Sequence, residues 1–211
     1  MRKKSLTRKG KALRWLLAAV VLGALAWVLL PWNLTAEAAH HQRLRQNYAA
    51  DTTIVYESTS LFDRTLLFSL NDHVIGMGVY ERHHLFLWDG ISSRVVEREV
   101  NRPYAAGYFC EYGYSHDSEE SMDFYYVYGV IEDESLTEIQ IDFVANVGGH
   151  DQSIRLQQAD WITNETGDVI FACTLEPEYG NLSRTLTVTG YRADGSAAAT
   201  LWLTGPTRWE D

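Results

Sequence analysis

Residues 123–131 read Asp-Phe-Tyr-Tyr-Val-Tyr-Gly-Val-Ile. Successive side chains of an extended strand point to opposite faces of a sheet, so this stretch presents apolar residues on both sides. One face carries Phe124, Tyr126, Tyr128 and Val130, and the other carries Tyr125, Val127 and Ile131. A strand that is apolar on both faces is normally covered on both. The stretch therefore predicts a central strand of a β-sheet.

The sequence around this stretch consists of short alternating segments separated by turn residues. In residues 138–145, Ile139, Ile141 and Phe143 share one face and polar side chains occupy the other, as in a half-buried strand. Asp194-Gly195 is a strong hairpin signal between two further segments. The predicted strands are residues 53–58, 65–70, 74–81, 84–88 (ended by Asp89-Gly90), 93–100, 106–114, 123–131, 138–145, 153–158, 169–175, 185–192 and 197–203.

The predicted fold class is mainly β, built from antiparallel β modules. No long amphipathic helix pattern interrupts residues 51–211, which disfavours parallel βαβ folds. An acidic segment at residues 115–121 divides this region into two candidate modules, about 51–114 and 122–205. Modules of this size would be marginally stable alone, so we expect the two to pack together.

The N-terminal region predicts a membrane segment. Trp15 to Thr35 is an uncharged run of 21 residues, which as a helix spans about 31 Å, close to the hydrocarbon thickness of a bilayer. We therefore expect a basic tail at residues 1–14 and a single-pass transmembrane helix, a signal-anchor, at residues 15–32, with the lipid bilayer as its partner. The alternative is a cleaved signal peptide with Ala36-Glu-Ala38 as the cleavage site.

Charge is divided unevenly along the 211 residues. The formal net charge is -10, but the first 36 residues carry +7 and the remainder has 11 arginines against 28 acidic residues, or -17. Since basic residues flanking a membrane span remain in the cytoplasm, the N-terminus is predicted to be cytoplasmic and the C-terminal domain to lie outside the cell membrane. A domain this acidic is not expected to bind nucleic acid.

Residues 33–50 predict a short juxtamembrane helix and stalk. The signals are a capping residue, an acid in the first turn and bases in the last turn: Asn33 or Thr35, then Glu37, then Arg43 and Arg45. The segment also contains His40, His41 and Gln42, and a segment with this many polar side chains is not expected to be buried. We therefore expect a spacer that lifts the domain off the bilayer.

Aromatic residues concentrate near the acidic segment and predict a candidate binding surface. The candidate residues are Tyr104, Tyr108, Tyr112, Tyr114 and Tyr125. Exposed rings beside carboxylates are typical of sugar-binding surfaces and of protein interfaces. The alternative is that these rings fill the core of the β domain.

Other candidate sites are few. Cys110 and Cys173 could form one disulfide in an oxidising compartment, and two buried free thiols are the alternative. The adjacent histidine pairs cannot easily share one ion, and the acids of residues 116–123 are typical of a solvated loop, so no metal or cofactor is predicted. The G-x-S-x-G and Walker A motifs are absent, and no catalytic residue is assigned.

Three stretches give the exported part a family resemblance: residues 70–80 leading to Leu87-Trp88, residues 126–133 leading to Ile139-Gln-Ile141, and residues 190–195. Each of the first two runs into a further strand, and the third contains the closing Asp-Gly hairpin. In these features the chain resembles small, uncharacterised membrane-anchored extracytoplasmic proteins of Gram-positive bacteria. The resemblance implies a β-rich extracytoplasmic domain and supplies no catalytic residue.

We therefore expect an envelope interaction, sensing or accessory binding module, not an enzyme, with an envelope or membrane-protein partner that the sequence does not identify. The alternative function is an envelope hydrolase that uses carboxylates.

Overall fold

The computed structural model of the chain describes residues 8–29, 33–47, 49, 51–60, 62–83, 87–99, 101–114, 121–145, 151–175 and 182–204. It contains helices α1 (Arg8–Leu29) and α2 (Ala36–Gln46), and a short 3-10 turn (Gln158–Asp160). The strands are β1 (Thr53–Thr59), β2 (Thr65–Leu70), β3 (Val74–His83), β4 (Leu87–Glu97), β5 (Tyr104–Tyr114), β6 (Ser121–Ile131), β7 (Leu136–Ala145), β8 (Asp151–Gln157), β9 (Ile162–Thr163), β10 (Val169–Leu175), β11 (Leu182–Arg192) and β12 (Ala197–Thr204).

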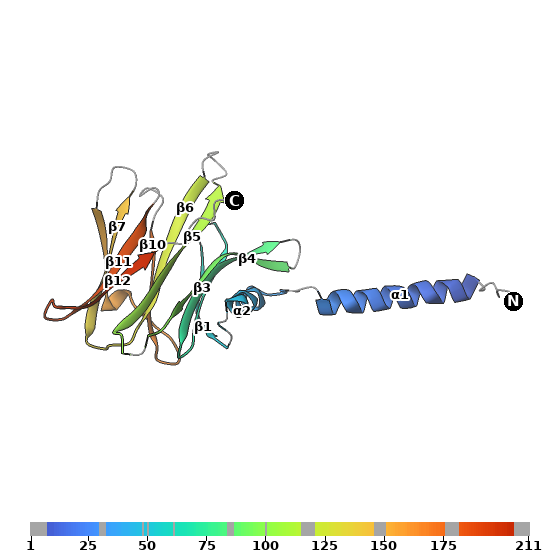
Figure 1. Cartoon of the computed structure of the whole chain (residues 1–211), viewed down its shortest axis with the longest axis horizontal. Helices are drawn as coiled ribbons and strands as arrows, with labels where there is room; N and C mark the ends of the chain where they lie inside the picture. The colour runs from blue at the N-terminus through green and yellow to red at the C-terminus, as the bar shows by residue number, and fades with distance from the viewer. Residues whose placement is uncertain are drawn as a thin grey trace.

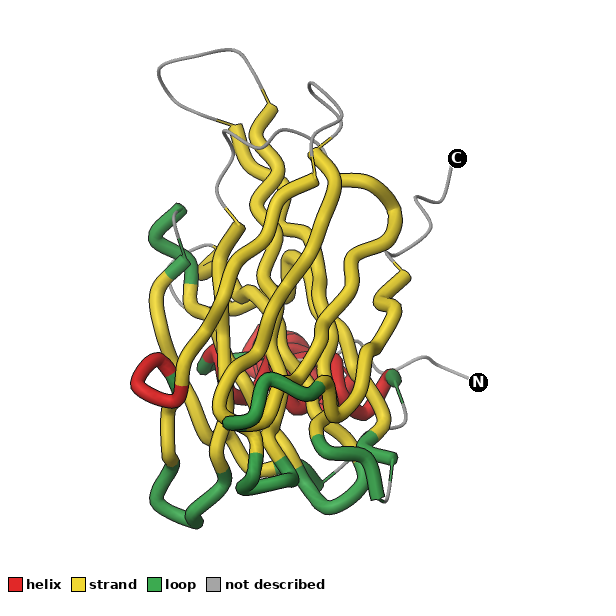
Figure 2. Tube along the Cα trace, turned by 90° about the vertical axis from the view of Figure 1, so that its left-hand side faces the viewer, coloured by secondary structure: helices red, strands yellow, loops and turns green. Residues whose placement is uncertain are grey.

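These strands form three antiparallel sheets of four strands each. Sheet A has the order β1-β2-β3-β4, sheet B the order β5-β6-β10-β9, and sheet C the order β12-β11-β7-β8. Sheet B lies between sheets A and C, and α2 lies on the side of sheet A away from sheet B (Figure 1). Figure 2 shows α2 running across the direction of the strands. The prediction of a mainly β, antiparallel fold is confirmed.

Sheet B is buried on both faces, as predicted from residues 123–131. Towards sheet C, side chains such as Val127 of β6 and Phe171 of β10 pack against Ile141 of β7 and Val188 of β11. Towards sheet A, the core contains Phe109, Tyr126 and Tyr128 of sheet B together with Phe68, Ile75 and Val79 of sheet A. The two apolar faces of β6 therefore each have a sheet packed over them.

The division into two modules at the acidic segment is not what the structure shows. Strands β5 and β6 pair along their whole length, from Tyr104 opposite Ile131 to Tyr114 opposite Ser121. Residues 115–120 lie outside the described residues, but they connect two neighbouring strands of one sheet. Each proposed module would thus contain part of sheet B, so the boundary between 51–114 and 122–205 divides a single sheet.

Asp89-Gly90 was expected to end a strand, but it lies inside β4. The pairing of β3 with β4 shifts register between Val79 and Tyr80, and Tyr80 then faces Gly90. A Cβ at Gly90 would lie 2.9 Å from Nε of Arg43 in α2. This glycine therefore permits the close approach of a helix to the sheet, and it does not mark a turn.

Helix α2 forms where it was predicted, with Thr35 as its N-cap: the Oγ1 atom accepts a hydrogen bond from the backbone N–H of Ala38 at 3.1 Å. The expectation that residues 33–50 are an unburied stalk is wrong. Ala39, His40 and Leu44 are buried against sheet A. A Cβ at Gly76 would lie 2.6 Å from Cδ2 of Leu44, so a glycine again lets the helix lie close to the strands.

The buried polar residue of α2 has partners for both ring nitrogens. Nδ1 of His40 lies 2.8 Å from the hydroxyl of Tyr80, and Nε2 lies 2.7 Å from the hydroxyl of Ser69. Burial, with a smaller effect of neighbouring His41, lowers the pKa of His40 from 6.5 to about 4. The ring is therefore neutral near pH 7 and can donate one hydrogen bond while accepting the other. This arrangement explains how a polar helix docks in a buried position.

Where side chains are described, no helix is both long enough and apolar enough to cross a membrane.

His40 makes the docking of α2 sensitive to acid. Its pKa is about 4 in the folded protein and 6.5 when unperturbed, so the unfolded chain binds more protons between these values. The stabilisation is fully present above pH 6.5 and is lost as the pH falls towards 4, by about 3 kcal/mol at the limit. Urea unfolding at pH 7 and pH 4 should show this loss in the wild type and a smaller one in His40→Asn. An equal loss in both proteins would contradict the assignment.

Candidate functional site

The tyrosines predicted to form a binding surface do not form one where the structure describes them. Tyr104 and Tyr108 are only 1% and 2% exposed and belong to the core between sheets B and C. Tyr125 is partly buried and packs against the same core. The side chains of Tyr112 and Tyr114 lie outside the described residues. For Tyr104 and Tyr108 the alternative reading, that the rings fill the core, is correct.

Tyr104 connects sheets B and C. Its hydroxyl lies 2.5 Å from the backbone oxygen of Val188 and 3.1 Å from that of Ala199. A Cβ at Gly190 would lie 2.9 Å from the Tyr104 ring, so the glycine makes room for it. Burial raises the pKa of Tyr104 to about 12. The residue is a buried hydrogen-bond donor between two layers, and ligands cannot reach its ring.

Cys110 and Cys173 are both free thiols. They lie on β5 and β10, which flank β6: Cys110 pairs opposite Tyr125, and Cys173 opposite Val127. Two strand spacings separate their chains by about 10 Å, whereas a disulfide requires Cα atoms within about 7 Å. The disulfide expectation is therefore wrong. Burial raises the pKa of Cys173 to about 11, which keeps this thiol protonated.

Among the side chains that the structure describes, an exposed aromatic residue of the β domain lies on a different sheet. Trp202 of β12 is 74% exposed, while its neighbours Leu201 and Leu203 pack against the core. It begins a row of paired residues that crosses all four strands of sheet C. Trp202 pairs with Thr187, Thr187 with Asp142, and Asp142 with Ser153. At the usual strand spacing the row is about 14 Å long.

We call the side of sheet C that carries this row the outer face of sheet C. A hollow of about 410 Å³ lies along it, lined by Trp202, Thr187, Asp142 and Ser153 among others. The carboxylate of Asp142 accepts hydrogen bonds from the amide of Gln140 at 2.8 and 3.0 Å. The face thus combines one apolar ring with an array of hydroxyl, amide and carboxylate groups.

The next row of this face continues the same chemistry. Thr200 pairs with Thr189, Thr189 with Gln140, and Gln140 with Arg155. The hydroxyls of Thr189 and Thr200 lie 3.1 Å apart. Because strand side chains alternate, all of these residues lie on the side of sheet C away from the core; Thr200 and Arg155 are exposed there, and Thr189 is only 6% exposed. Such a face can stack against the apolar side of a ligand and exchange hydrogen bonds with its polar groups.

The sequence of β11 and β12 already contains a signal for this face. Leu186 and Val188 alternate with threonines in β11, and Leu201 and Leu203 flank Trp202 in β12. If the leucines face the core, the tryptophan between them must face outward. Alternation within one strand is therefore a better indicator of exposure than clustering of aromatic residues along the chain.

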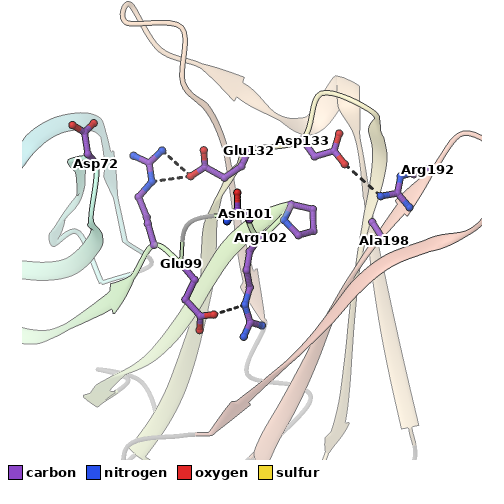
Figure 3. A pocket seen from close by; sticks show the side chains of 10 residues that line it. Asp72, Glu99, Asn101, Arg102, Glu132, Asp133, Arg192 and Ala198 are labelled. Carbon is purple, nitrogen blue, oxygen red and sulfur yellow. Dashed lines mark hydrogen bonds and ion pairs between the residues drawn. The ribbon is translucent and has the colours of Figure 1, made fainter.

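A second candidate site is a charged pocket of about 560 Å³ at one end of the sheets (Figure 3). It is formed by the connections β2–β3, β4–β5 and β6–β7 together with the end of β11. Three ion pairs line it: Arg98 with Glu132 at 2.7 Å, Arg102 with Glu99 at 2.6 Å, and Arg192 with Asp133 at 3.5 Å.

The ion pairs of this pocket limit what its acids can do chemically. Hydrogen bonds from Ser135, and then the nearby guanidinium of Arg192, hold the pKa of Asp133 below its usual value. A general acid of a glycoside hydrolase instead needs a raised pKa. The pocket is therefore better suited to joining loops from different sheets than to donating a proton.

A buried carboxylate elsewhere in the domain accepts hydrogen bonds from three side chains. Glu111 of β5 is 0% exposed and accepts hydrogen bonds from Arg64 at 2.9 Å, Tyr126 at 2.7 Å and Ser60 at 3.2 Å. Three donors compensate the buried carboxylate, which has no access to solvent.

Among the side chains that the structure describes, no three His, Cys, Asp or Glu residues form a group that could hold a metal ion.

Tyr104→Phe should test the structural role of this ring. Removing the hydroxyl leaves the carbonyls of Val188 and Ala199 without this buried donor, so the free energy of unfolding should fall by about 1–2 kcal/mol. Denaturant unfolding measures the loss. Tyr191→Phe, which changes a partly buried tyrosine of β11, is the matched control and should have a smaller effect. Equal stability of Tyr104→Phe and the wild type would show that the hydrogen bond is dispensable.

No protein-family model matches the chain, and no match was found among curated proteins or solved structures.

Proposed function

We propose that the chain is a single-pass membrane protein whose extracytoplasmic β domain binds a neutral glycan of the cell envelope on the outer face of sheet C. The observation that carries this proposal is Trp202, which is 74% exposed at one end of a row of hydroxyl and carboxylate side chains. The exposed ring of Trp202 gives a flat apolar surface that a ligand or partner can cover.

The membrane part of the proposal is supported by helix α1 and the sequence of residues 15–32. The apolar side chains described in α1 project outward: Leu13, Trp15, Leu16, Leu17, Val20, Val21 and Leu22 are 48–78% exposed. A segment that is apolar on all sides, as residues 15–23 of α1 are, is stable only when an apolar environment surrounds it. The +7 charge that precedes residue 37 favours a cytoplasmic N-terminus and an exported β domain.

A neutral glycan fits the chemistry of the outer face of sheet C. The Trp202 ring offers a flat apolar surface for one side of a sugar ring, and Asp142, Thr187 and Ser153 offer acceptors and donors for hydroxyl groups. The part of the chain after residue 36 carries -17, so its field repels anionic polymers. These two features together favour an uncharged, hydroxyl-rich ligand.

The alternative of a carboxylate hydrolase has no specific support among the described residues. The acids that line the charged pocket include Glu99, Glu132 and Asp133, and each is paired with an arginine. The acids that line the hollow on the outer face of sheet C are Asp142, which accepts hydrogen bonds from Gln140, and Asp151, and both lie on an open sheet surface. Binding without turnover is the function that this geometry supports best.

The proposal predicts saturable binding of neutral oligosaccharides that depends on Trp202. Isothermal titration of the full chain in detergent micelles with a panel of glucan, mannan and N-acetylglucosamine oligomers is the measurement. Trp202→Ala should weaken binding at least about tenfold, because truncating a tryptophan that anchors an interface typically costs about 2 kcal/mol or more. Trp202→Phe should restore part of the affinity, since it keeps an aromatic platform.

Leu34→Ala is the matched control, because Leu34 is 50% exposed but lies before α2, away from sheet C. It should bind as the wild type does. If no oligosaccharide of the panel binds saturably, or if Trp202→Ala binds as tightly as the wild type, the proposed function is wrong.

A further inference from the structure

The chain between α1 and the β domain is very short. Helix α1 ends at Leu29, and the backbone oxygen of Asn33 already accepts a hydrogen bond from the backbone N–H of Trp88 in β4 at 2.8 Å. The side chain of Asn33 also donates to Gln42 of α2. From residue 33 onward, therefore, the chain is attached to the β domain. Leu29 and Asn33 are four residue steps apart, so the connection spans at most about 14 Å when fully extended.

Helix α2 does not lengthen the connection between α1 and the β domain, because it is fixed on sheet A. Leu44 is buried against Gly76, and Arg43 donates a hydrogen bond to the backbone oxygen of Gly90 at 2.9 Å. His40 is held by Ser69 and Tyr80. The eleven residues of α2 thus lie along the domain and do not separate it from α1.

The side of the domain nearest to α1 consists of α2, the end of β3 and the start of β4. Figure 1 shows this end of β3 and β4 projecting from the sheets on the side from which α1 emerges. We call this side the α2–β4 face and define it by Arg43, Arg82, His83, Leu87 and Trp88. Arg82 and His83 are exposed, while Leu87 and Trp88 are half-buried. A hollow of about 470 Å³ lies between Arg43, His83, Leu87 and Trp88.

The chemistry of the α2–β4 face matches the headgroup region of a bilayer. Tryptophan favours this region because its ring is apolar and its N–H is polar, and arginine combines an apolar stem with a charged end. The described arginines on these elements are Arg43, Arg45 and Arg82. Asp89 is paired with Arg43 at 3.3 Å, and a carboxylate oxygen of Glu37 lies 3.7 Å from Nε2 of His41.

We infer that the α2–β4 face lies on the membrane surface and contacts phospholipid headgroups of the bilayer that holds α1. This inference rests on the membrane anchor of the proposed function. Since sheet B separates sheet A from sheet C, the same orientation directs the outer face of sheet C, with Trp202, away from the membrane and towards the envelope. The short connection keeps the β domain close to the bilayer, and the side chains of the α2–β4 face suit contact with the headgroup region.

The test compares two probes in the full chain, reconstituted into vesicles of phosphatidylcholine with one quarter phosphatidylglycerol. An environment-sensitive fluorophore is attached to His83→Cys, or to Arg155→Cys as the matched control on an exposed strand position of sheet C, with Cys110 and Cys173 changed to alanine. The probe at 83 should emit at shorter wavelength and be quenched by doxyl-labelled lipid. The probe at 155 should be at least about threefold more accessible to aqueous iodide.

Both labelled proteins must keep the unfolding midpoint of the unlabelled cysteine-free chain, which excludes misfolding as a cause. Flotation of the vesicles after an alkaline wash separates the two proposals. If the chain does not float with the vesicles, the membrane anchor is wrong and this inference fails with it. If it floats but iodide reaches residues 83 and 155 equally, the anchor stands and the membrane contact of the α2–β4 face is wrong.

Discussion

The apolar nature of both faces of sheet B is the constraint on which the rest of the structure depends. Leaving either face in water would cost about 25 cal/mol for each Å² of apolar surface. Sheet A covers one face and sheet C covers the other, so the domain acquires three layers of strands. Each outer sheet then has one remaining face. Helix α2 covers that of sheet A, whereas that of sheet C is polar around the exposed Trp202.

The layers are held in one arrangement by buried polar groups that find their partners across them. His40 joins α2 to sheet A, Glu111 of sheet B is bound by Arg64 next to β2, and the hydroxyl of Tyr104 reaches the carbonyls of sheet C. A buried donor or acceptor that loses its partner costs about 1–3 kcal/mol. Any sliding of one layer over another would break such a contact, so these groups specify how the layers pack.

Local sequence patterns predicted most strands well, because alternation reports directly which residues point the same way. The strands at residues 65–70 and 169–175 agree with β2 and β10 at both ends. The errors arise where a tertiary contact decides. Gly90 resembles a turn residue until Arg43 is seen packed over it, and α2 is polar enough to suggest exposure until the glycines beneath it are considered. Tyr104 and Tyr108 were offered as surface residues for the same reason, since their neighbours in space come from other sheets.

The sequence by itself determined where the strands lie, which of their faces are apolar, and how charge is divided between the N-terminal 36 residues and the acidic remainder. Only the tertiary structure decided which apolar faces are covered, and therefore that Tyr104 is buried while Trp202 is exposed. It also placed β6 between the strands of Cys110 and Cys173, so that their thiols remain free. The physical reason is that periodicity is a property of neighbouring residues, whereas sheet order and layer packing depend on contacts between residues far apart in the chain.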